Sequence, residues 1–457
     1  MPDSLAADLP RVIPSPVPLT GLPLLRAVLR NAVEALPPGV YTRPVVVQPF
    51  LGRDRIFLQD PDLIQRVLVT EAESFGKSDS MRRALEPALG QGILTAHGEH
   101  WRWQRRAVAP IFRQDRLRAF TQPMLDAALR RRDRWRERPS GSTVEVAQEM
   151  MRTTFDIIEE TMLSGHGAID AARVEHCIAD YVESTGWSIA LAMAKAPSWA
   201  PYPGRRRAAR ARDYLRAELL RLVEQRRRLG SEREDLIALL LSARDPETGH
   251  AMDDRDVADN LLTFIAAGHE TTALALTWAF YLLALHPEAE ERALAEIATA
   301  TGGADPTAES LEGMPFLRAV LHEAMRLYPP VPIVSRSALR EVPLGPVTVP
   351  EGAPVYFPVY AIHRHALLWH RPNAFDPDRF ATDAIRARHR YAFLPFGGGP
   401  RTCIGLTFAT LEAVAILATL LPAIRLRPPP GFRPELRMRI TLRPFPGMPM
   451  RLERRPA

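Results

Sequence analysis

The 457-residue sequence contains little cysteine, almost no lysine and no long apolar run. Its two cysteines, Cys177 and Cys403, allow one disulfide at most, which excludes a disulfide-stapled scaffold. Lysine occurs only at Lys77 and Lys195, so arginine supplies nearly all of the positive charge behind a formal net charge of +6. No stretch of about 18 or more apolar residues is present, so we expect no membrane-spanning helix.

The first 18 residues are mildly acidic and rich in proline, and they lack the apolar core of a signal peptide. We therefore expect a cytoplasmic protein with reduced thiols and no membrane anchor. Arginines gather in runs at 130–132, 205–207 and 226–228, within segments of helical periodicity. Such runs are typical of solvated helix faces, and no zinc-finger spacing accompanies them, so we expect no nucleic-acid partner.

Hydrophobic periodicity predicts a mainly α protein with a minor β region. Residues 1–40 are predicted to form a proline-rich segment on the surface, and residues 41–457 a single domain. Val45–Phe50 and Arg55–Leu58 are predicted to form a hairpin, with Pro49 placing the first strand at a sheet edge. Apolar residues at helical spacing are found near 99–110, 117–138, 144–163, 171–195, 207–228, 231–243, 254–285, 288–300, 314–327 and 404–421.

The longest predicted helix runs from Asp254 to Leu285 and contains no proline. At about 1.5 Å per residue it would cross a whole domain, and its apolar composition predicts a buried central helix. A period of two between residues 342 and 360 predicts a small β element. We expect a second one from strands 437–442 and 450–452, joined by a turn through residues 443–447.

The most informative segment is the loop Phe396-Gly397-Gly398-Gly399-Pro400-Arg401-Thr402-Cys403-Ile404-Gly405, which precedes a helical pattern. A cysteine at a helix N-terminus is stabilised as the thiolate by free N–H groups and by the helix dipole. Taken alone, Cys403 is a structural residue, a nucleophile or a metal ligand. Zinc needs several Cys or His partners, whereas a haem iron needs a single protein thiolate.

The loop resembles the haem-binding signature of the cytochrome P-450 family, F-x-x-G-x-R-x-C-x-G, at every fixed position. Other marks of that family follow in the expected order between about residues 40 and 455. The resemblance implies a cytochrome P-450-like fold with a long central helix over the haem. It also implies haem b, iron protoporphyrin IX, as the cofactor, with Cys403 as the axial ligand of its iron and with Phe396 and Gly405 beside it.

Within the long helix, Ala267-Gly268-His269-Glu270-Thr271-Thr272 resembles the family's oxygen-activation motif. A hydroxyl that bonds back to a carbonyl beside a glycine can open or kink a helix and leave a groove. The resemblance implies that Thr271 holds oxygen and water and that Glu270 relays protons. Without that resemblance, Gly268 would be a glycine that the helix tolerates, and Glu270 would be a surface residue. His269 is expected to serve packing or local hydrogen bonding.

Charged residues elsewhere also match the family. Glu323 and Arg326, three residues apart on one predicted helix, resemble its E-x-x-R motif, and Arg379 would complete a structural trio. The two carboxylates of haem need cations or donors. Residues with that role by resemblance are Trp101, Arg105, Arg336 and Arg401.

The expected activity is that of a haem-thiolate monooxygenase, which inserts one atom of O2 into a small lipophilic substrate by hydroxylation or epoxidation. Electrons would come from a separate ferredoxin or flavodoxin with its reductase, because the sequence has no flavin or nicotinamide fingerprint of its own. Alternatives are a peroxide-driven peroxygenase and a haem-based gas sensor or carrier. Predicted residues of the substrate pocket are Phe264, Ala267, Val331, Val334 and Phe445.

Overall fold

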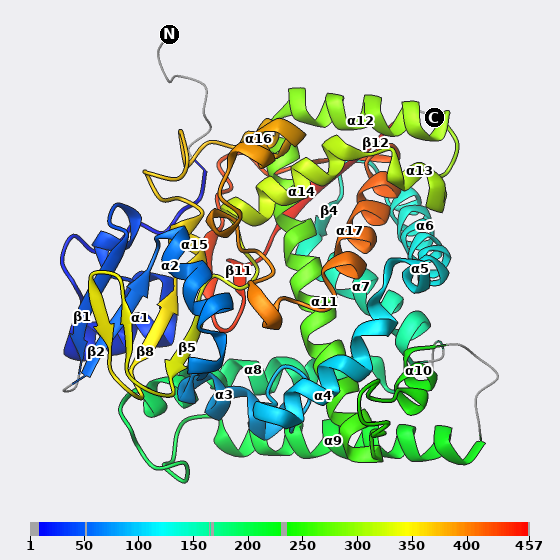
Figure 1. Ribbon diagram of the computed structural model, residues 1–457. Coiled ribbons are helices and arrows are strands. Elements are labelled where there is room, and N and C mark those ends of the chain that lie inside the picture. Colours follow the sequence, from blue (N-terminus) through cyan, green and yellow to red (C-terminus); the bar gives the residue numbers. More distant parts are fainter. Residues whose placement is uncertain (1–8, 51–52, 164, 166–168, 230–234, 456–457) are drawn as a thin grey trace.

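The computed structural model describes residues 9–50, 53–163, 165, 169–229 and 235–455. Helices dominate it, and a smaller β region lies to one side (Figure 1), as the sequence predicts. None of the described helices is both long and apolar enough to cross a membrane. The helices are α1 (Gly21–Arg30), α2 (Pro61–Gln65), α3 (Asp79–Leu89), α4 (Gly98–Val108), α5 (Gln114–Leu117), α6 (Thr121–Glu137), α7 (Val146–Met162), α8 (Ala171–Met193), α9 (Arg205–Leu229), α10 (Leu236–Ser242), α11 (Asp254–Leu285), α12 (Pro287–Thr301), α13 (Ala308–Glu312), α14 (Pro315–Leu327), α15 (Val359–Ile362), α16 (Thr382–Ala387) and α17 (Leu406–Leu420).

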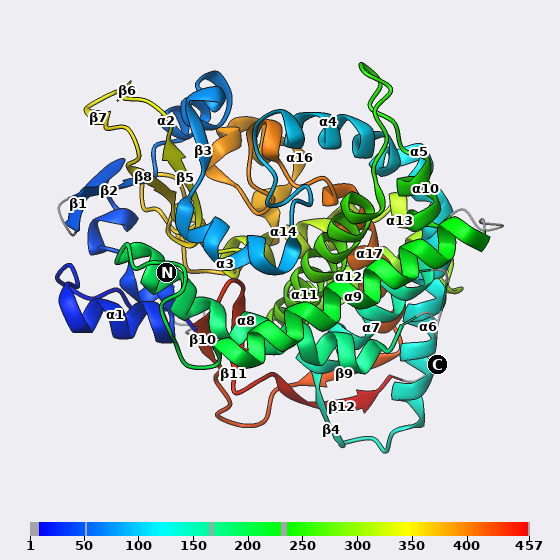
Figure 2. The ribbon, with the colours of Figure 1, turned by 90° about the horizontal axis from the view of Figure 1, so that it is seen from below.

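Helix α11 runs through the middle of the molecule, with α7, α9, α14 and α17 packed around it (Figures 1 and 2). It begins with a capping box in which Asp253 and Asp256 each accept a hydrogen bond from the other's backbone N–H. Most of its side chains are buried, which explains its largely apolar composition. The predicted bounds of this helix are confirmed.

Among the described residues, the strands form four separate sheets. The largest has the order β1-β2-β8-β5-β3, and β1 lies at its edge, so the predicted place of Pro49 on an edge strand is confirmed. The described strands are β1 (Val45–Phe50), β2 (Arg53–Leu58), β3 (Phe75–Lys77), β4 (Thr143–Glu145), β5 (Val334–Ala338), β6 (Val342–Leu344), β7 (Val347–Val349), β8 (Pro354–Phe357), β9 (Ile424–Arg427), β10 (Glu435–Met438), β11 (Leu442–Phe445) and β12 (Pro449–Arg454).

The predicted pairing at the C-terminus is wrong. Strand β10 pairs with β11 through a three-residue loop, whereas β12 pairs with β9 and β4. Two short strands close to each other in sequence form the tight hairpin, and the last strand joins partners that periodicity alone does not identify.

The N-terminal segment is more structured than the sequence predicts. It contains α1, and Leu9, Val33 and Val40 are buried in the main core. The hydroxyl of Tyr328 donates a hydrogen bond to the carbonyl of Pro10 over 3.0 Å. The segment therefore packs as part of the core, and the boundary at residue 40 stays a prediction.

Candidate active site

A largely apolar cavity of about 400 Å³ lies between α11 and the loop that precedes α17. The cysteine loop forms one wall, and the middle of α11 forms the opposite wall. Predicted site residues that line this single cavity are Trp101, Arg105, Phe264, Ala267, Glu270, Thr271, Val331, Val334, Arg336, Phe396, Arg401, Cys403 and Gly405.

One predicted pocket residue, Phe445, is not among the lining residues. Side chains alternate along β11, so Leu442 and Pro444 are buried while Phe445 is 38% exposed. Its ring instead lies against the guanidinium of Arg437 on β10. On this side of the cavity the wall comes from Ile440 and Thr441, in the loop between the two strands.

The cysteine loop is closed by the backbone N–H of Cys403, which donates a hydrogen bond to the carbonyl of Phe396 over 2.9 Å. Gly399 has φ +69°, and a Cβ there would lie 1.9 Å from the carbonyl oxygen of Leu68, so only glycine fits. A Cβ on Gly405 would lie 4.0 Å from Cys403 Sγ. The loop thus presents the sulfur to the cavity with little beside it.

Burial raises the pKa of the Cys403 thiol, while the backbone N–H of Gly405 and the charge of Arg105 act in the opposite direction. The surface of Cys403 that stays accessible faces the cavity. A cation bound in the cavity would stabilise the thiolate. The neighbouring amide and arginine favour the same charge state.

Four cations line the cavity, contributed by Lys77, Arg105, Arg336 and Arg401. No ion pair is found for any of them within the described part of the chain. Burial lowers the pKa of Arg336 to about 10, and burial with the charge of Arg336 lowers that of Arg401 to about 10. Four such cations without an acidic partner create a site for a ligand that carries negative charge.

Lys77 is the member of this set that the sequence does not reveal. It lies on β3 directly opposite Arg336 on β5, so two like charges face each other across an antiparallel pair. Burial, Arg336 and Arg401 lower its pKa. As one of only two lysines, Lys77 could have been noticed, but its partner follows from strand pairing that the sequence does not show.

The indole of Trp101 lies under the guanidinium of Arg401, whose carbon is 4.1 Å from the ring centroid. Arg401 also donates a hydrogen bond to the carbonyl of Ala96 over 2.9 Å. These contacts fix the direction of Arg401 without neutralising its charge. The predicted pair Trp101 and Arg105, one turn apart on α4, both line the cavity.

On the opposite wall, the groove in α11 comes from residues that leave the helix surface bare. Ala266, Ala267 and Gly268 are partly or fully exposed, although nearly all of the helix is buried. The hydroxyl of Thr271 donates a hydrogen bond to the carbonyl of Ala267 over 2.6 Å, as predicted for a hydroxyl beside a glycine. The helix stays continuous, so the groove arises from small side chains and not from a break.

Glu270 is almost fully buried beside this groove. Its carboxylate accepts a hydrogen bond from Arg443 Nε over 2.6 Å and another from the hydroxyl of Thr441. His269 Nδ1 lies 2.8 Å from the carbonyl oxygen of Ile265, and burial lowers the pKa of the imidazole. The structure thus places His269 in packing and local hydrogen bonding.

The predicted trio Glu323, Arg326 and Arg379 comes together away from the cavity. Arg326 Nε lies 2.6 Å from Glu323 Oε2, and both side chains are 0% exposed. Arg379 Nε is 3.5 Å from Glu323 Oε1. Arg326 also donates hydrogen bonds to the carbonyls of residues 363, 372 and 374, so it ties α14 to the segment before the cysteine loop.

Another acidic residue was missed by sequence reasoning. Glu412 on α17 lines the cavity and is buried, and burial raises its pKa to about 8, with Thr272 acting in the opposite direction. A carboxyl group in this environment is largely protonated at neutral pH. Helix α17 is otherwise mostly apolar in sequence, so the neighbours of Glu412 could not be identified from the sequence.

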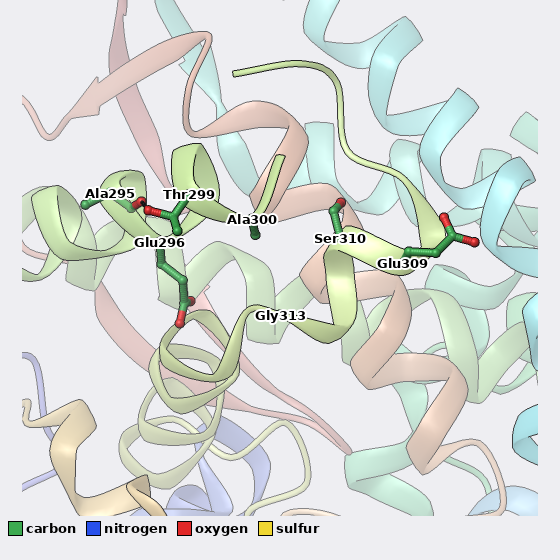
Figure 3. Close-up of a pocket in the computed structure, with 7 residues that line it drawn as sticks. All are labelled: Ala295, Glu296, Thr299, Ala300, Glu309, Ser310 and Gly313. Atoms are coloured by element: carbon green, nitrogen blue, oxygen red, sulfur yellow. Dashed lines mark hydrogen bonds between the residues drawn. The ribbon is translucent and has the colours of Figure 1, made fainter. Parts of the chain in front are cut away.

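A second cavity lies between α12 and α13 (Figure 3). Its two acidic side chains, Glu296 and Glu309, point in different directions. Glu296 accepts hydrogen bonds from the backbone N–H groups of Phe316 and Leu317 over 2.7 and 2.8 Å, so it caps the start of α14. We assign Glu296 to helix stability and no chemistry to this cavity.

The known proteins that this chain resembles are consistent with a site of this kind. The family model for cytochrome P450 matches residues 41–448. The chain is 35% identical to cyclooctat-9-en-7-ol 5-monooxygenase of Streptomyces melanosporofaciens, over 84% of this chain and 83% of that protein. It is 31% identical to cyclooctatin synthase of the same organism, over 96% and 95%. It is also 33% identical to cytochrome P450 4A6 of Oryctolagus cuniculus, over 88% and 82%.

Among solved structures, the crystal structure of the cytochrome P450DA heme domain superposes with a TM-score of 0.81 at 27% identity, covering 90% of both chains. These relatives are consistent with the fold, the cysteine loop and the cation-lined cavity described above. The chain belongs to the cytochrome P450 family of haem-thiolate monooxygenases.

Proposed function

We propose that this monooxygenase inserts one oxygen atom from O2 into a terpenoid or fatty-acid-like substrate. The observation that carries the proposal is a cysteine sulfur that faces a largely apolar cavity, with Glu270 and Thr271 on the opposite wall. The cofactor is haem b, which, held by a thiolate, supplies the activation of O2. The two Streptomyces relatives are named a cyclooctat-9-en-7-ol 5-monooxygenase and a cyclooctatin synthase, which favours a cyclic, hydrocarbon-rich substrate.

The cofactor would be held by groups on three sides. Cys403 would ligate the iron, Gly405 would leave room above the sulfur, and Phe396 would close the loop beside it. Lys77, Arg105, Arg336 and Arg401, with Trp101 beside them, would bind the two carboxylates. The donor set fits such a dianion because these four cations have no ion-pair partner among the described residues.

Protons would reach the distal side through α11. The Thr271 hydroxyl gives its hydrogen to Ala267, so its oxygen faces the cavity as an acceptor that can hold a water molecule. The Glu270 carboxylate would receive protons from solvent and pass them to that water. The surrounding side chains exclude bulk water, which keeps proton delivery confined to this pair.

The apolar wall of the cavity favours a substrate rich in hydrocarbon. Two of its polar groups are already engaged: Thr263 donates its hydroxyl hydrogen to the carbonyl of Asp259, and Tyr181 donates its own to the carbonyl of Ala84. Apolar residues of this wall are Leu85, Ile93, Leu94, Phe112, Ile178, Val182, Leu215, Phe264, Ala267, Val331, Val334 and Ile440.

The electron donor we propose is a ferredoxin or a flavodoxin with its reductase, in the cytoplasm, where Cys403 stays a reduced thiol. Arg113 and Arg116 are exposed at α5, which packs against the cysteine helix α17. Exposed Leu406 adjoins the cysteine loop. Acidic partners of this kind are steered by basic side chains around a small apolar contact.

Two measurements test the function. First, the reduced, carbon-monoxide-treated protein should show the red-shifted Soret band of thiolate-ligated haem. Cys403→Ser should abolish that band and Cys177→Ser should preserve it. An unchanged spectrum in Cys403→Ser would refute the ligand assignment.

Second, cyclooctat-9-en-7-ol, geranylgeraniol and dodecanoic acid should be offered with a surrogate ferredoxin, its reductase, NADPH and 18O2. A product carrying one 18O atom supports the proposal. Product formed equally well from hydrogen peroxide alone would favour a peroxygenase. Ligand-induced spin-state changes without any product across a broad lipid panel would favour a sensor or carrier.

A further inference from the structure

The hairpin of β10 and β11 ends beside the acidic side chain of α11. Glu270 is ion-paired with Arg443, and their side chains are 5% and 32% exposed. Arg443 Nε and the Thr441 hydroxyl both donate to Glu270 Oε1. Glu270 and Thr441 also line the cavity. One carboxylate oxygen is therefore held by a hairpin that forms part of the cavity wall.

The tip of this hairpin is a tight loop. Met438 and Leu442 are paired, so only Arg439, Ile440 and Thr441 lie between the strands. The backbone N–H of Arg439 donates to the carbonyl of Thr441 over 3.1 Å. Ile440 presents its side chain to the cavity at the tip. Ile440 and Thr441 are adjacent in this loop and both line the cavity, so a molecule that displaces Ile440 also acts on Thr441.

A carboxylate oxygen held in this way is not free to turn toward the cavity. Charge-assisted hydrogen bonds from a guanidinium stabilise the ionised form and fix the direction of the side chain. To pass a proton toward Thr271, Glu270 must first accept one and then turn its oxygen to the cavity. Both steps become easier when Arg443 and Thr441 release the oxygen.

We propose that Thr441 and Arg443 form a tether that restrains Glu270, and that a molecule seated against Ile440 loosens it. The two residues are positioning residues, since they act through Glu270. The consequence for proton delivery rests on the function proposed above. The linkage between tether and occupancy does not, because coupling is reciprocal: a ligand that loosens the tether must bind more tightly once the tether is cut.

The direct test measures binding. The probe is 1-dodecylimidazole, whose ring binds haem and whose alkyl chain fills the apolar cavity, and imidazole alone serves as the matched probe without a chain. The holoproteins compared are the wild type, Arg443→Gln, Thr441→Val and Arg437→Gln. Arg437 faces Arg443 directly across the hairpin, and its partners are the ring of Phe445 and the carboxylate of Glu435, so Arg437→Gln is the matched control.

We expect Arg443→Gln and Thr441→Val to bind 1-dodecylimidazole about fivefold more tightly or better, the lower end of typical coupling between sites. Imidazole should bind all four proteins alike, and Arg437→Gln should match the wild type for both probes. Equal or weaker binding of the long probe by both tether variants would overturn the proposal. Because Thr441→Val keeps the side-chain volume, a poorly folded Arg443→Gln protein does not remove the test.

A second readout separates this inference from the proposed function. With surrogate ferredoxin and no substrate, Arg443→Gln should consume NADPH severalfold faster than the wild type, with a smaller ratio of rates in H2O and D2O. If binding tightens while NADPH consumption and the isotope ratio stay unchanged, the tether stands and the proton-carrying role of Glu270 fails. If neither changes, the tether itself is refuted.

Discussion

The molecule contains two groups of buried charges that differ in one respect. At Glu323 and Arg326 each charge meets its opposite within the chain, and backbone carbonyls accept the remaining N–H groups of the guanidinium. At the cavity, Lys77 and Arg336 face each other as like charges with no acid between them. The first group is complete after folding, whereas the second is completed by a bound anion.

This difference separates residues that stabilise the fold from residues that bind the cofactor. Breaking the complete group leaves a buried charge without a partner and destabilises the protein directly. Substituting a cation of the second group removes repulsion between like charges in the apoprotein. In the holoprotein, the same substitution removes attraction to the carboxylates of haem. Mutations in the two groups should therefore have opposite effects on the protein without haem.

The largest effect is expected at the complete group. Arg326→Leu leaves the buried Glu323 carboxyl without its main partner, which should cost about 3–5 kcal/mol of unfolding free energy and prevent stable haem incorporation. Urea unfolding and the haem-to-protein ratio measure this. Arg292→Leu, which breaks an exposed ion pair with Asp378, is the control and should cost less than about 1 kcal/mol. A normal holoprotein from Arg326→Leu would contradict the structural role.

The next largest effect should appear on the distal wall, where folding does not depend on the residue. Thr271→Ala should keep full haem content and thermal stability but lower product formed per NADPH by about tenfold or more, because proton delivery loses its hydroxyl. Thr277→Ala is the matched control, since Thr277 makes the same backbone hydrogen bond on α11 away from the cavity. Unchanged coupling in Thr271→Ala would argue against the proton path.

A smaller effect with a defined pH dependence is expected at Lys77. Burial and nearby arginines lower its pKa below the ordinary 10.5, so the unfolded chain binds more protons than the folded apoprotein. Stability of the apoprotein should therefore rise with pH up to about 10.5, and Lys77→Met should flatten that rise.

In the holoprotein the same substitution should release haem faster to apomyoglobin, because a carboxylate loses its cation. Lys195→Met is the control, as the only other lysine lies exposed. Slower haem release from Lys77→Met, or an unchanged slope of apoprotein stability with pH, would contradict a cationic site that the cofactor completes.

The smallest effect is expected at Phe445, the one predicted pocket residue that faces away from the cavity. Phe445→Ala should change the affinity for 1-dodecylimidazole by less than about twofold, since a surface substitution of this kind seldom exceeds about 0.5 kcal/mol. Ile440→Ala should change it more, because Ile440 lines the cavity. A larger change in Phe445→Ala than in Ile440→Ala would reverse the assignment of that wall.

The sequence predicted what local spacing controls. Glu323 and Arg326 are three residues apart, Trp101 and Arg105 four, and the cysteine loop is one continuous motif, so each predicted set came together in the structure. The bounds of α11 followed from its apolar run and from the His286-Pro287 stop.

Contacts set by strand register or by loop direction could not be predicted in this way. The pairing of Lys77 with Arg336 and the tether from Arg443 to Glu270 join segments far apart in sequence, and no periodicity encodes them. Helix α3 was missed because Pro87 lies inside it, and α1 because it falls in a proline-rich segment.

The five-stranded sheet has a consequence for biosynthesis. Strands β2 and β3 come from the early part of the chain, whereas their neighbours β8 and β5 come from the late part. On the ribosome the emerging N-terminal half thus has neither the strand that positions Lys77 nor the loop that carries Cys403. Haem capture must wait until the segment that carries Cys403 has emerged, and until then the apolar cavity walls lack part of their cover and are prone to aggregate.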